Sequence, residues 1–243
     1  TAELERFQHL TYVLSLDPFV TAAAAGRARD ALNRRLADFA TEAGIDAIYL
    51  MDQSGLTVAA SNHANPSSFL GQNYGFRPYF AEALAGTQGR FYAIGATTGR
   101  PGYFIADPVR RGDGEVMGVI ALKIDLSTLE ESWRVSGEQV LLANSDGVVL
   151  LASDPAWQYR ALTDLTEDQS TRIAAARQFT GQALDPLDWT PDGQGRASIS
   201  DSERIHLTAA LGAHGWVLHY FADDAPAVTR SWLAAAFVLV IAG

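Results

Sequence analysis

The chain has 243 residues, of which 48% are hydrophobic, and it carries a formal net charge of −10. That length suits one large domain or two small ones, and the apolar share is typical of a folded core rather than a disordered chain. The acidic balance argues against a nucleic-acid partner, and the absence of cysteine excludes disulfides, thiolate metal ligands and cysteine nucleophiles.

The first segment, residues 1–43, is predicted to be a long helix with a break near Asp17-Pro18. Leu32, Leu36, Phe39 and Ala43 recur at helical spacing, and Gly44 ends the helix as a glycine just past a helix end commonly does. We expect this helix to transmit a signal and to form the contact of a homodimer.

A sequence repeat follows. Ile48 to Ser61 reads IYLMDQSGLTVAAS, and Val140 to Ser153 reads VLLANSDGVVLLAS, aligned without a gap at an offset of 92 residues. Each copy has two apolar strands around a polar turn, with Gly55 and Gly147 at the same place, and this pattern predicts a hairpin. A period this long is not that of a solenoid, so it indicates two similar small domains in tandem.

Between the hairpins the sequence predicts a helix that begins at Pro78 and three strands, at 90–95, 102–109 and 116–124. The turn Arg111-Gly-Asp-Gly makes the last two strands a hairpin. Ser127-Thr-Leu-Glu has the form of a capping box and predicts a helix toward Trp133.

The second half repeats this plan with less material. A second capping box, Thr166-Glu-Asp-Gln, predicts a helix to Phe179, and strands are expected near 197–200, 205–211 and 216–221. The predicted fold class is therefore α+β, with antiparallel sheets in modules at 44–133 and 134–225.

Residues 226–243 are predicted to form a C-terminal helix that leads into a membrane span. From Trp232 to Gly243 the chain has no polar break, but these twelve residues are fewer than the roughly 20 that cross a bilayer. The alternative is a buried C-terminal helix. Thr1 opens directly into a helical pattern, so we expect an earlier span before it as well, with the protein held in the membrane by both flanking helices.

No catalytic signature was found: the sequence has no HExxH, GxSxG, phosphate-binding loop or dinucleotide-binding glycine pattern. Gly95-Ala-Thr-Thr-Gly99 lacks the lysine of a phosphate loop. The five histidines are interpreted as structural or exposed, so we expect no metal, no cofactor and no catalytic residue.

Two cations are the candidate binding groups. Lys123 is the only lysine among 18 basic residues, and it lies in an apolar strand, where a charge is costly unless it is paired. Arg77 lies among the aromatic residues of Phe76-Arg-Pro-Tyr-Phe80, whose rings exclude water and strengthen a charge-assisted hydrogen bond. The structural alternatives are a lysine on a solvent-facing strand and an arginine stacked on aromatics as surface cover.

The stretch from Gly71 to Trp133 resembles the membrane-distal module of C4-dicarboxylate sensor histidine kinases of the DctB type. The matching motifs are NYxFRPYF from Asn73, GRFYAxGxTTGxPGYF from Gly89, and KxDLxxLExxW from Lys123. Nearly the whole chain resembles double-Cache sensor domains, in which a long helix precedes two PAS-like modules.

This resemblance implies a periplasmic domain of a bacterial inner-membrane protein that binds succinate, fumarate or malate and signals to a cytoplasmic histidine kinase. The segment itself would not be an enzyme. The implied carboxylate ligands are Arg77 and Lys123, Thr97, Thr98 and the backbone near Gly99 would donate hydrogen bonds, and Tyr74, Phe76 and Tyr103 would shape the walls.

Other readings stay open at this stage. A Cache sensor of amino acids or acetate would place a carboxylate against an ammonium, with Asp107 and Asp125 as candidates, or would hold a single cation. The output domain could be a chemoreceptor or a diguanylate cyclase. A membrane-tethered hydrolase would need a nucleophile with its base, which the sequence does not show, and a purely structural dimerisation module would leave both cations in solvent.

Overall fold

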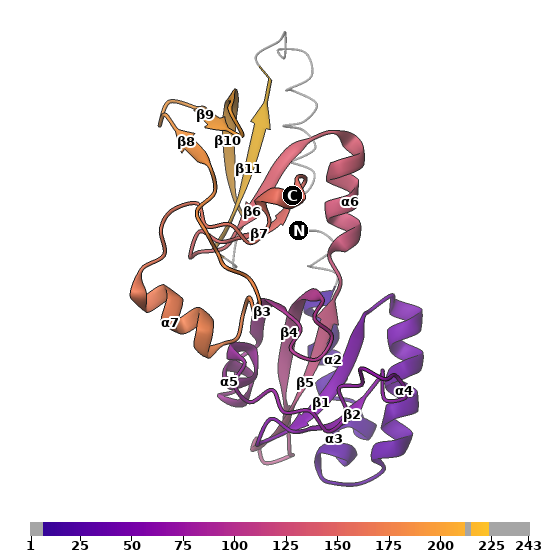
Figure 1. Ribbon diagram of the computed structural model, residues 1–243. Helices are drawn as coiled ribbons and strands as arrows, with labels where there is room; N and C mark the ends of the chain where they lie inside the picture. The colour runs from indigo at the N-terminus through magenta and orange to yellow at the C-terminus, as the bar shows by residue number, and fades with distance from the viewer. Residues whose placement is uncertain (1–6, 212–214, 224–243) are drawn as a thin grey trace. The chain divides into compact units, whose positions relative to one another are not determined.

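The computed structural model describes residues 7–211 and 215–223, and these form two compact units (Figure 1). The first, called the N-terminal unit, contains residues 7–126 together with Arg172–Thr180. The second, called the C-terminal unit, contains Ser127–Thr171 together with 181–211 and 215–223. Each is built on one antiparallel sheet, which confirms the α+β class predicted from the sequence.

The sheet of the N-terminal unit has five strands in the order β2-β1-β5-β4-β3. They are β1 (Ala47–Asp52), β2 (Thr57–Ala60), β3 (Gly89–Ile94), β4 (Pro101–Arg110) and β5 (Val116–Ile124). The three strands predicted between the hairpins are thus confirmed to within one or two residues. β4 and β5 pair as the expected hairpin, and the central β1 and β5 are buried along almost their whole length.

The prediction of a single long N-terminal helix is wrong, because within the described residues this segment contains three separate helices of six residues or more. These are α2 (Leu10–Ser15), α3 (Pro18–Ala24) and α4 (Arg29–Ala43). The first break is the predicted one, where Asp17 caps α3 and Pro18 starts it. The second break follows Ala24, and Ala28 there has a left-handed backbone with φ of 53°. α4 ends at a left-handed Gly44, as predicted.

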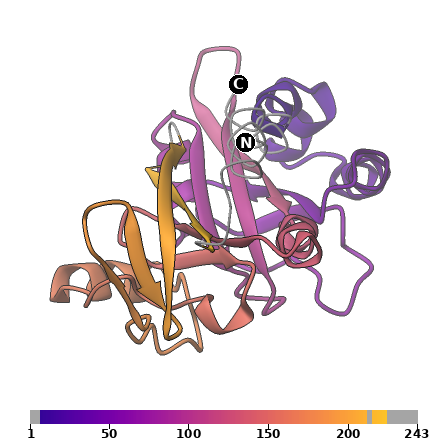
Figure 2. The same cartoon turned by 90° about the horizontal axis from the view of Figure 1, so that it is seen from above.

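These helices cover one face of the sheet, with Leu32 and Leu36 of α4 fully buried. Figure 2 shows them gathered on one side of the strands. The other face packs against α5 (Pro78–Leu84), whose Tyr79 and Phe80 join the aromatic core of this unit. Gly89 permits the close contact between α5 and β3, because a Cβ there would lie 2.1 Å from the carbonyl oxygen of Tyr79.

The C-terminal unit has a six-stranded sheet in the order β7-β6-β11-β10-β9-β8. Its elements are α6 (Ser127–Ser136), β6 (Gln139–Ala143), β7 (Val149–Ala152), η1 (Pro155–Trp157), the first part of α7 (Glu167–Ala175), β8 (Trp189–Pro191), β9 (Arg196–Ile199), β10 (Ser202–Leu211) and β11 (Trp216–Ala222). The residues of α7 from Arg172 onward belong to the N-terminal unit. The first five strands follow the same connectivity as the sheet of the N-terminal unit. β8 was not predicted, and α7 ends before the predicted Phe179.

The sequence repeat is confirmed down to single hydrogen bonds. Gly55 and Gly147 both have positive φ, at 84° and 77°. In each turn the preceding polar side chain, Asp52 or Asn144, accepts from backbone N–H groups two and four residues later. The closing serine hydroxyl of each copy accepts from the backbone N–H of the first residue of that copy, Ile48 or Val140, and both hairpins have a register shift at the equivalent position.

The unit boundaries differ from the predicted modules at three places. Helices α2 to α4 are part of the N-terminal unit and do not form a separate helical segment. Helix α6 belongs to the C-terminal unit, and Arg172–Thr180 belongs to the N-terminal unit. The predicted helix and membrane span at 226–243 lie outside the described residues. Among those described, no helix is long and apolar enough to cross a bilayer.

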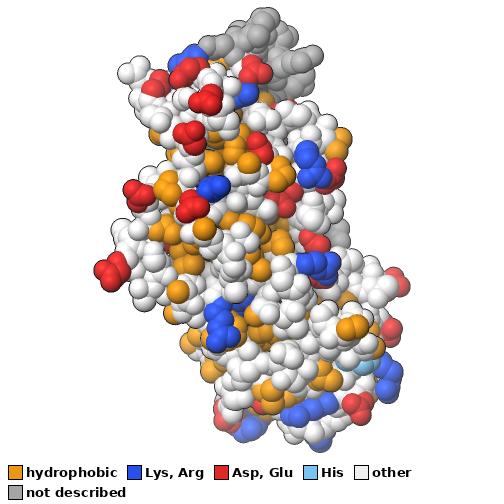
Figure 3. Space-filling model, viewed as in Figure 1, with side chains coloured by type: hydrophobic (Ala, Val, Ile, Leu, Met, Phe, Trp, Pro, Cys, Tyr) orange, Lys and Arg blue, Asp and Glu red, His pale blue; other side chains and the backbone are white. Residues whose placement is uncertain are grey.

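Charged side chains of both signs are mixed over the face shown in Figure 3. No continuous basic area is visible among the described residues of that face. This distribution agrees with the net charge of −10, which argued against phosphate backbones as partners.

Candidate functional site

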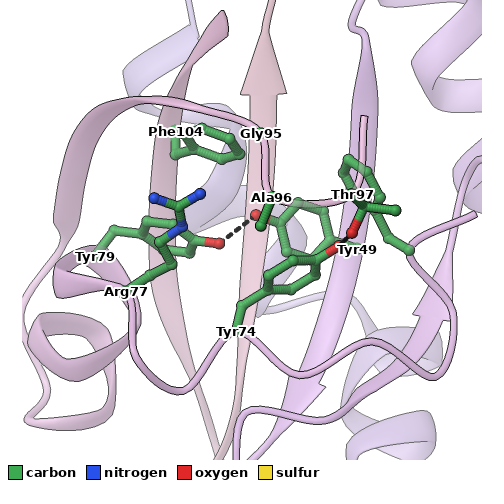
Figure 4. Close-up of a pocket in the computed structure, with 9 residues that line it drawn as sticks. Tyr49, Tyr74, Arg77, Tyr79, Gly95, Ala96, Thr97 and Phe104 are labelled. Atoms are coloured by element: carbon green, nitrogen blue, oxygen red, sulfur yellow. Dashed lines mark hydrogen bonds between the residues drawn. The ribbon is translucent and has the colours of Figure 1, made fainter. Parts of the chain in front are cut away.

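A narrow cavity lies in the N-terminal unit between α5, the strands and the turn that follows β3 (Figure 4). It is lined by aromatic rings, small residues of the turn and one cation: Tyr49, Phe69, Tyr74, Arg77, Tyr79, Gly95, Ala96, Thr97 and Phe104. Arg77 is the single charged residue in this lining. The volume open to the centres of water-sized molecules is about 10 Å³, which is space for roughly one water.

Arg77 is held by its place in the chain. It is the N-cap of α5, with extended backbone, and Pro78 follows as the first helical residue. Its side chain is 1% exposed, so the interpretation of Arg77 as surface cover is wrong. Burial lowers the pKa of its guanidinium, and the ring of Phe76 lies 5.0 Å from the guanidinium carbon.

Three backbone carbonyls accept hydrogen bonds from this guanidinium. Nη2 donates to Ile94 at 2.8 Å, and Nη1 donates to Ala176 at 2.9 Å and to Arg177 at 3.0 Å. A guanidinium has five N–H groups, so these bonds leave two of them for other acceptors. Arg77 therefore stabilises the fold through these hydrogen bonds and also places a positive charge at the cavity.

Two pairs of hydroxyls also line the cavity. The Tyr74 and Thr97 hydroxyls lie 2.6 Å apart, and the Tyr49 and Tyr79 hydroxyls lie 2.7 Å apart. Burial raises the pKa of all three tyrosines, so they remain protonated at neutral pH. The cavity is thus a mainly apolar space with a guanidinium and hydroxyl groups in its walls.

Lys123 is buried as well, at 0% exposed, and this rules out the solvent-facing alternative. Its ammonium donates to Asp46 Oδ2 at 2.5 Å and to Thr98 Oγ1 at 3.4 Å. Asp46 also pairs with Arg100, at 3.1 Å. The charge of Lys123 is compensated inside the protein, as a buried ammonium requires.

Lys123 is not in the cavity lining, but it lies directly behind it. A Cβ on Gly95, which does line the cavity, would lie 3.7 Å from Cε of Lys123, and a Cβ on Gly102 would lie 2.6 Å from it. Gly102 therefore leaves room for the lysine stem, whereas Gly95 shows only that the stem is next to the lining.

The predicted site residues lie at different distances from the cavity. Tyr74, Arg77 and Thr97 line the cavity. Thr98 bonds Lys123 behind it, and Gly99, with φ of 65°, closes the turn through its N–H to the Gly95 carbonyl. Phe76 packs against the same aromatic core. Tyr103 is not in this group, because it lies on the opposite face of β4 from Phe104.

Sequence reasoning missed the lining residues Tyr49, Phe69, Tyr79, Gly95, Ala96 and Phe104, and it missed Asp46, the partner of Lys123. Tyr79 belongs to the quoted NYxFRPYF motif and could have been found there. Tyr49 alternates with Met51 onto the core face of β1, which strand periodicity could have suggested. Asp46 carried no local signal, since it reaches Lys123 across 77 residues of sequence.

The acidic candidates for an ammonium-binding site are elsewhere. Asp107 is buried on the other face of β4 and accepts from Gln88 at 2.8 Å. Asp125 is exposed at the end of β5. In the described part of the chain no group of three or more histidines, aspartates or glutamates could hold a metal ion. Two of the described histidines, His206 and His219, form a pair in the C-terminal unit.

Comparisons with known proteins agree with this architecture. A family model described as Cache domain matches residues 1–231. The C4-dicarboxylate transport sensor protein DctB of Rhizobium meliloti is 36% identical over 200 residues, which are 79% of this chain and 32% of that protein. The protein of the same name from Pseudomonas aeruginosa is 33% identical over 190 residues, or 78% of this chain and 29% of that protein. The chain therefore spans about a third of the length of these curated relatives.

Among solved structures, the sensor domain of the histidine kinase DctB of V. cholerae superposes with a TM-score of 0.81 at 27% identity. The match covers 92% of this chain and 91% of that one. The ligand-binding domain of the Pseudomonas fluorescens chemoreceptor CtaA, solved with L-isoleucine, has a TM-score of 0.57 at 19% identity over 90% of this chain and 86% of its own. This second likeness concerns the fold alone.

Proposed function

Since the chain belongs to the Cache domain family, we propose that it is the periplasmic, ligand-binding part of a membrane sensor histidine kinase and that it binds C4-dicarboxylates. The observation that carries the proposal is the buried guanidinium of Arg77 in the wall of an aromatic cavity with hydroxyl donors. The name shared by the two curated relatives supports this ligand class.

One carboxylate of the ligand would bind at Arg77. The two N–H groups that the backbone carbonyls leave unused match the two oxygens of a carboxylate. The surrounding rings exclude water, which strengthens a charged hydrogen bond.

The second carboxylate would be held from the direction of Lys123. The ammonium lies behind Gly95 and beside Thr98. A carboxylate that enters past this turn would accept a hydrogen bond from the Lys123 ammonium, either together with Asp46 or in its place. Asp46 keeps Arg100 as a second partner, so its own charge stays compensated. Two cations then balance a dianion without an unpaired charge.

Binding would require the cavity to widen, because its present volume holds roughly one water. The turn from Gly95 to Gly99 is the wall best suited to move. It is linked to the opposite wall by the hydrogen bond between the Thr97 and Tyr74 hydroxyls, and a ligand carboxylate can replace that partner for either hydroxyl. A ligand that binds one turn conformation better than the other biases the equilibrium between them.

An amino acid is the competing ligand class, since Cache neighbours of similar fold were solved with amino acids. An amino acid would need an acceptor for its ammonium, and the described lining contains no carboxylate. The dicarboxylate is therefore favoured.

Calorimetric titration of the purified chain with succinate, fumarate and malate tests the proposal. We expect binding at about micromolar to millimolar concentration, and loss of binding in Lys123→Met. Arg111→Ala, in an exposed turn, is the matched control and should bind as the wild type does. Absence of heat with all three dicarboxylates, together with heat from an amino acid, would reject the dicarboxylate and favour the competing class.

A further inference from the structure

The Tyr49 and Tyr79 hydroxyls form an isolated pair in the wall of the cavity (Figure 4). Both side chains are 1% exposed, and their oxygens lie 2.7 Å apart. The pair comes from two elements, β1 and α5, that are 30 residues apart in sequence. Gly89 lets α5 approach the sheet closely enough to place the Tyr79 hydroxyl there.

Counting protons shows what this pair has to offer. Two hydroxyls carry two protons, and one hydrogen bond between them uses one proton. The second proton has no acceptor among the contacts described for either tyrosine. A buried donor without an acceptor is destabilising, so the pair favours an occupant of the cavity that can accept a hydrogen bond.

The neighbouring groups decide which acceptor fits. Arg77 lies two residues before Tyr79 at the start of α5 and lines the same cavity. A guanidinium offers only donors. The occupant that fits best therefore accepts hydrogen bonds from both Arg77 and a tyrosine hydroxyl, as a carboxylate does. Its negative charge also strengthens the bond from the hydroxyl.

We propose that Tyr79 is a ligand-binding residue that donates its hydroxyl proton to the carboxylate held by Arg77, and that Tyr49 positions this hydroxyl by donating to it. This inference rests on the proposed function and adds two residues to its site. It assigns the residues different roles: Tyr79 contacts the ligand, and Tyr49 acts through Tyr79.

Burial raises the pKa of both tyrosines above the usual range. Both hydroxyls therefore keep their protons throughout the neutral range, and donation to a ligand does not depend on pH there.

The test is a calorimetric titration of succinate into wild type, Tyr79→Phe, Tyr49→Phe and the double variant. Tyr79→Phe should weaken binding at least about tenfold, which is the loss of one charge-assisted hydrogen bond. Tyr49→Phe should weaken it only about twofold to fourfold, because Tyr79 keeps its proton. The double variant should match Tyr79→Phe.

Tyr92→Phe is the matched control. Tyr92 is also buried, at 3% exposed, but it lies on the opposite face of the sheet from Ala93, which packs in the aromatic core. Its removal should leave succinate affinity unchanged, even if thermal stability falls as it does in the other variants. If the tyrosine pair had only a structural role, the succinate affinity would be the same in the wild type, Tyr79→Phe, Tyr49→Phe and the double variant.

The outcomes separate this inference from the proposal on which it rests. If the wild type binds no dicarboxylate, both are rejected. If it binds succinate and Tyr79→Phe binds within threefold, or if Tyr49→Phe loses more than Tyr79→Phe, the inference alone is overturned. Should Tyr79→Phe fail to fold, a crystal structure of the wild type with succinate decides, with Tyr79 Oη expected at 2.5–3.0 Å from a carboxylate oxygen.

Discussion

Arg77 has two roles, and its substitution will reveal both. Its guanidinium satisfies the carbonyls of Ile94, Ala176 and Arg177 and also lines the cavity. Two of these carbonyls lie in Arg172–Thr180, the segment that returns to the N-terminal unit. An arginine with this many structural partners cannot be removed without changing more than the ligand site.

Arg77→Ala is therefore expected to lower the free energy of unfolding by about 2–4 kcal/mol, because it leaves buried carbonyls without a donor. Urea denaturation measures this loss. Hydrogen exchange should also show less protection of the Ile94 amide, which donates to Gln178 in the same segment.

Arg100→Ala is the control for that experiment. Arg100 forms an ion pair with Asp46, but its side chain is 64% exposed, so its removal should cost no more than about 1 kcal/mol. Equal stability of Arg77→Ala and wild type would show that the three carbonyl bonds contribute nothing.

At the scale of the elements, the sequence predicted most of the fold. Hairpins, strands and capping boxes are local patterns, so 90–95, 102–109 and 116–124 were found nearly to the residue, and Thr166 and Gln169 do form a capping box. The second break in the N-terminal helix lies at Gly26-Arg-Ala. It was missed because the apolar residues on both sides of it continue at helical spacing.

The candidate site was only partly predictable, for a physical reason. A motif names residues on one stretch of chain, such as Arg77 and Tyr74, but their partners come from elsewhere. Asp46 meets Lys123 only because β1 and β5 are neighbours in the sheet. Ala176 and Arg177 lie about a hundred residues after Arg77 in the sequence. They contact it through backbone carbonyls, which every residue has, so their residue types do not indicate the contact.

Strands β10 and β11 contain a histidine pair that should make stability depend on pH. His206 Nε2 and His219 Nδ1 lie 3.0 Å apart, with Trp189 against both rings. Burial and, to a smaller extent, the nearby His206 lower the pKa of His219 to about 4. The pKa of His206 is also lowered by burial, which Asp192 partly opposes.

In the unfolded chain both histidines titrate near pH 6.5. Between pH 6.5 and 4 the unfolded state therefore binds more protons than the folded state, so the free energy of unfolding falls as the pH falls through this window. For His219, which is largely buried, we expect a loss of about 2 kcal/mol.

Urea denaturation at pH 7 and pH 5 measures this effect, and His219→Gln should show a smaller difference between the two pH values. His9→Gln serves as control, because His9 is exposed and its loss should leave the difference as in wild type. An unchanged difference in His219→Gln would show that the pair does not carry the pH dependence.

At the scale of the whole molecule, the exposed apolar residues of the N-terminal helices suggest a second copy of the chain as partner. Tyr12, Val13 and Leu16 of α2 are 56%, 60% and 63% exposed, and Phe19 of α3 is 46% exposed. Large apolar side chains gathered on one helical segment are typical of a protein interface, and a homodimer buries the same patch on both copies.

We predict that two copies associate through these side chains and that Leu16→Glu weakens the association at least tenfold, because it places a charge where the two copies would bury an apolar side chain. Sedimentation velocity across a concentration series measures the shift toward monomer. Val135→Glu is the matched control, since Val135 is 76% exposed on α6, outside the N-terminal helices, and should leave association unchanged. If Leu16→Glu and wild type sediment alike at every concentration, the N-terminal helices are not the dimer contact. A ligand-induced change would then have to be transmitted from the N-terminal unit along its own chain rather than across an interface between two copies.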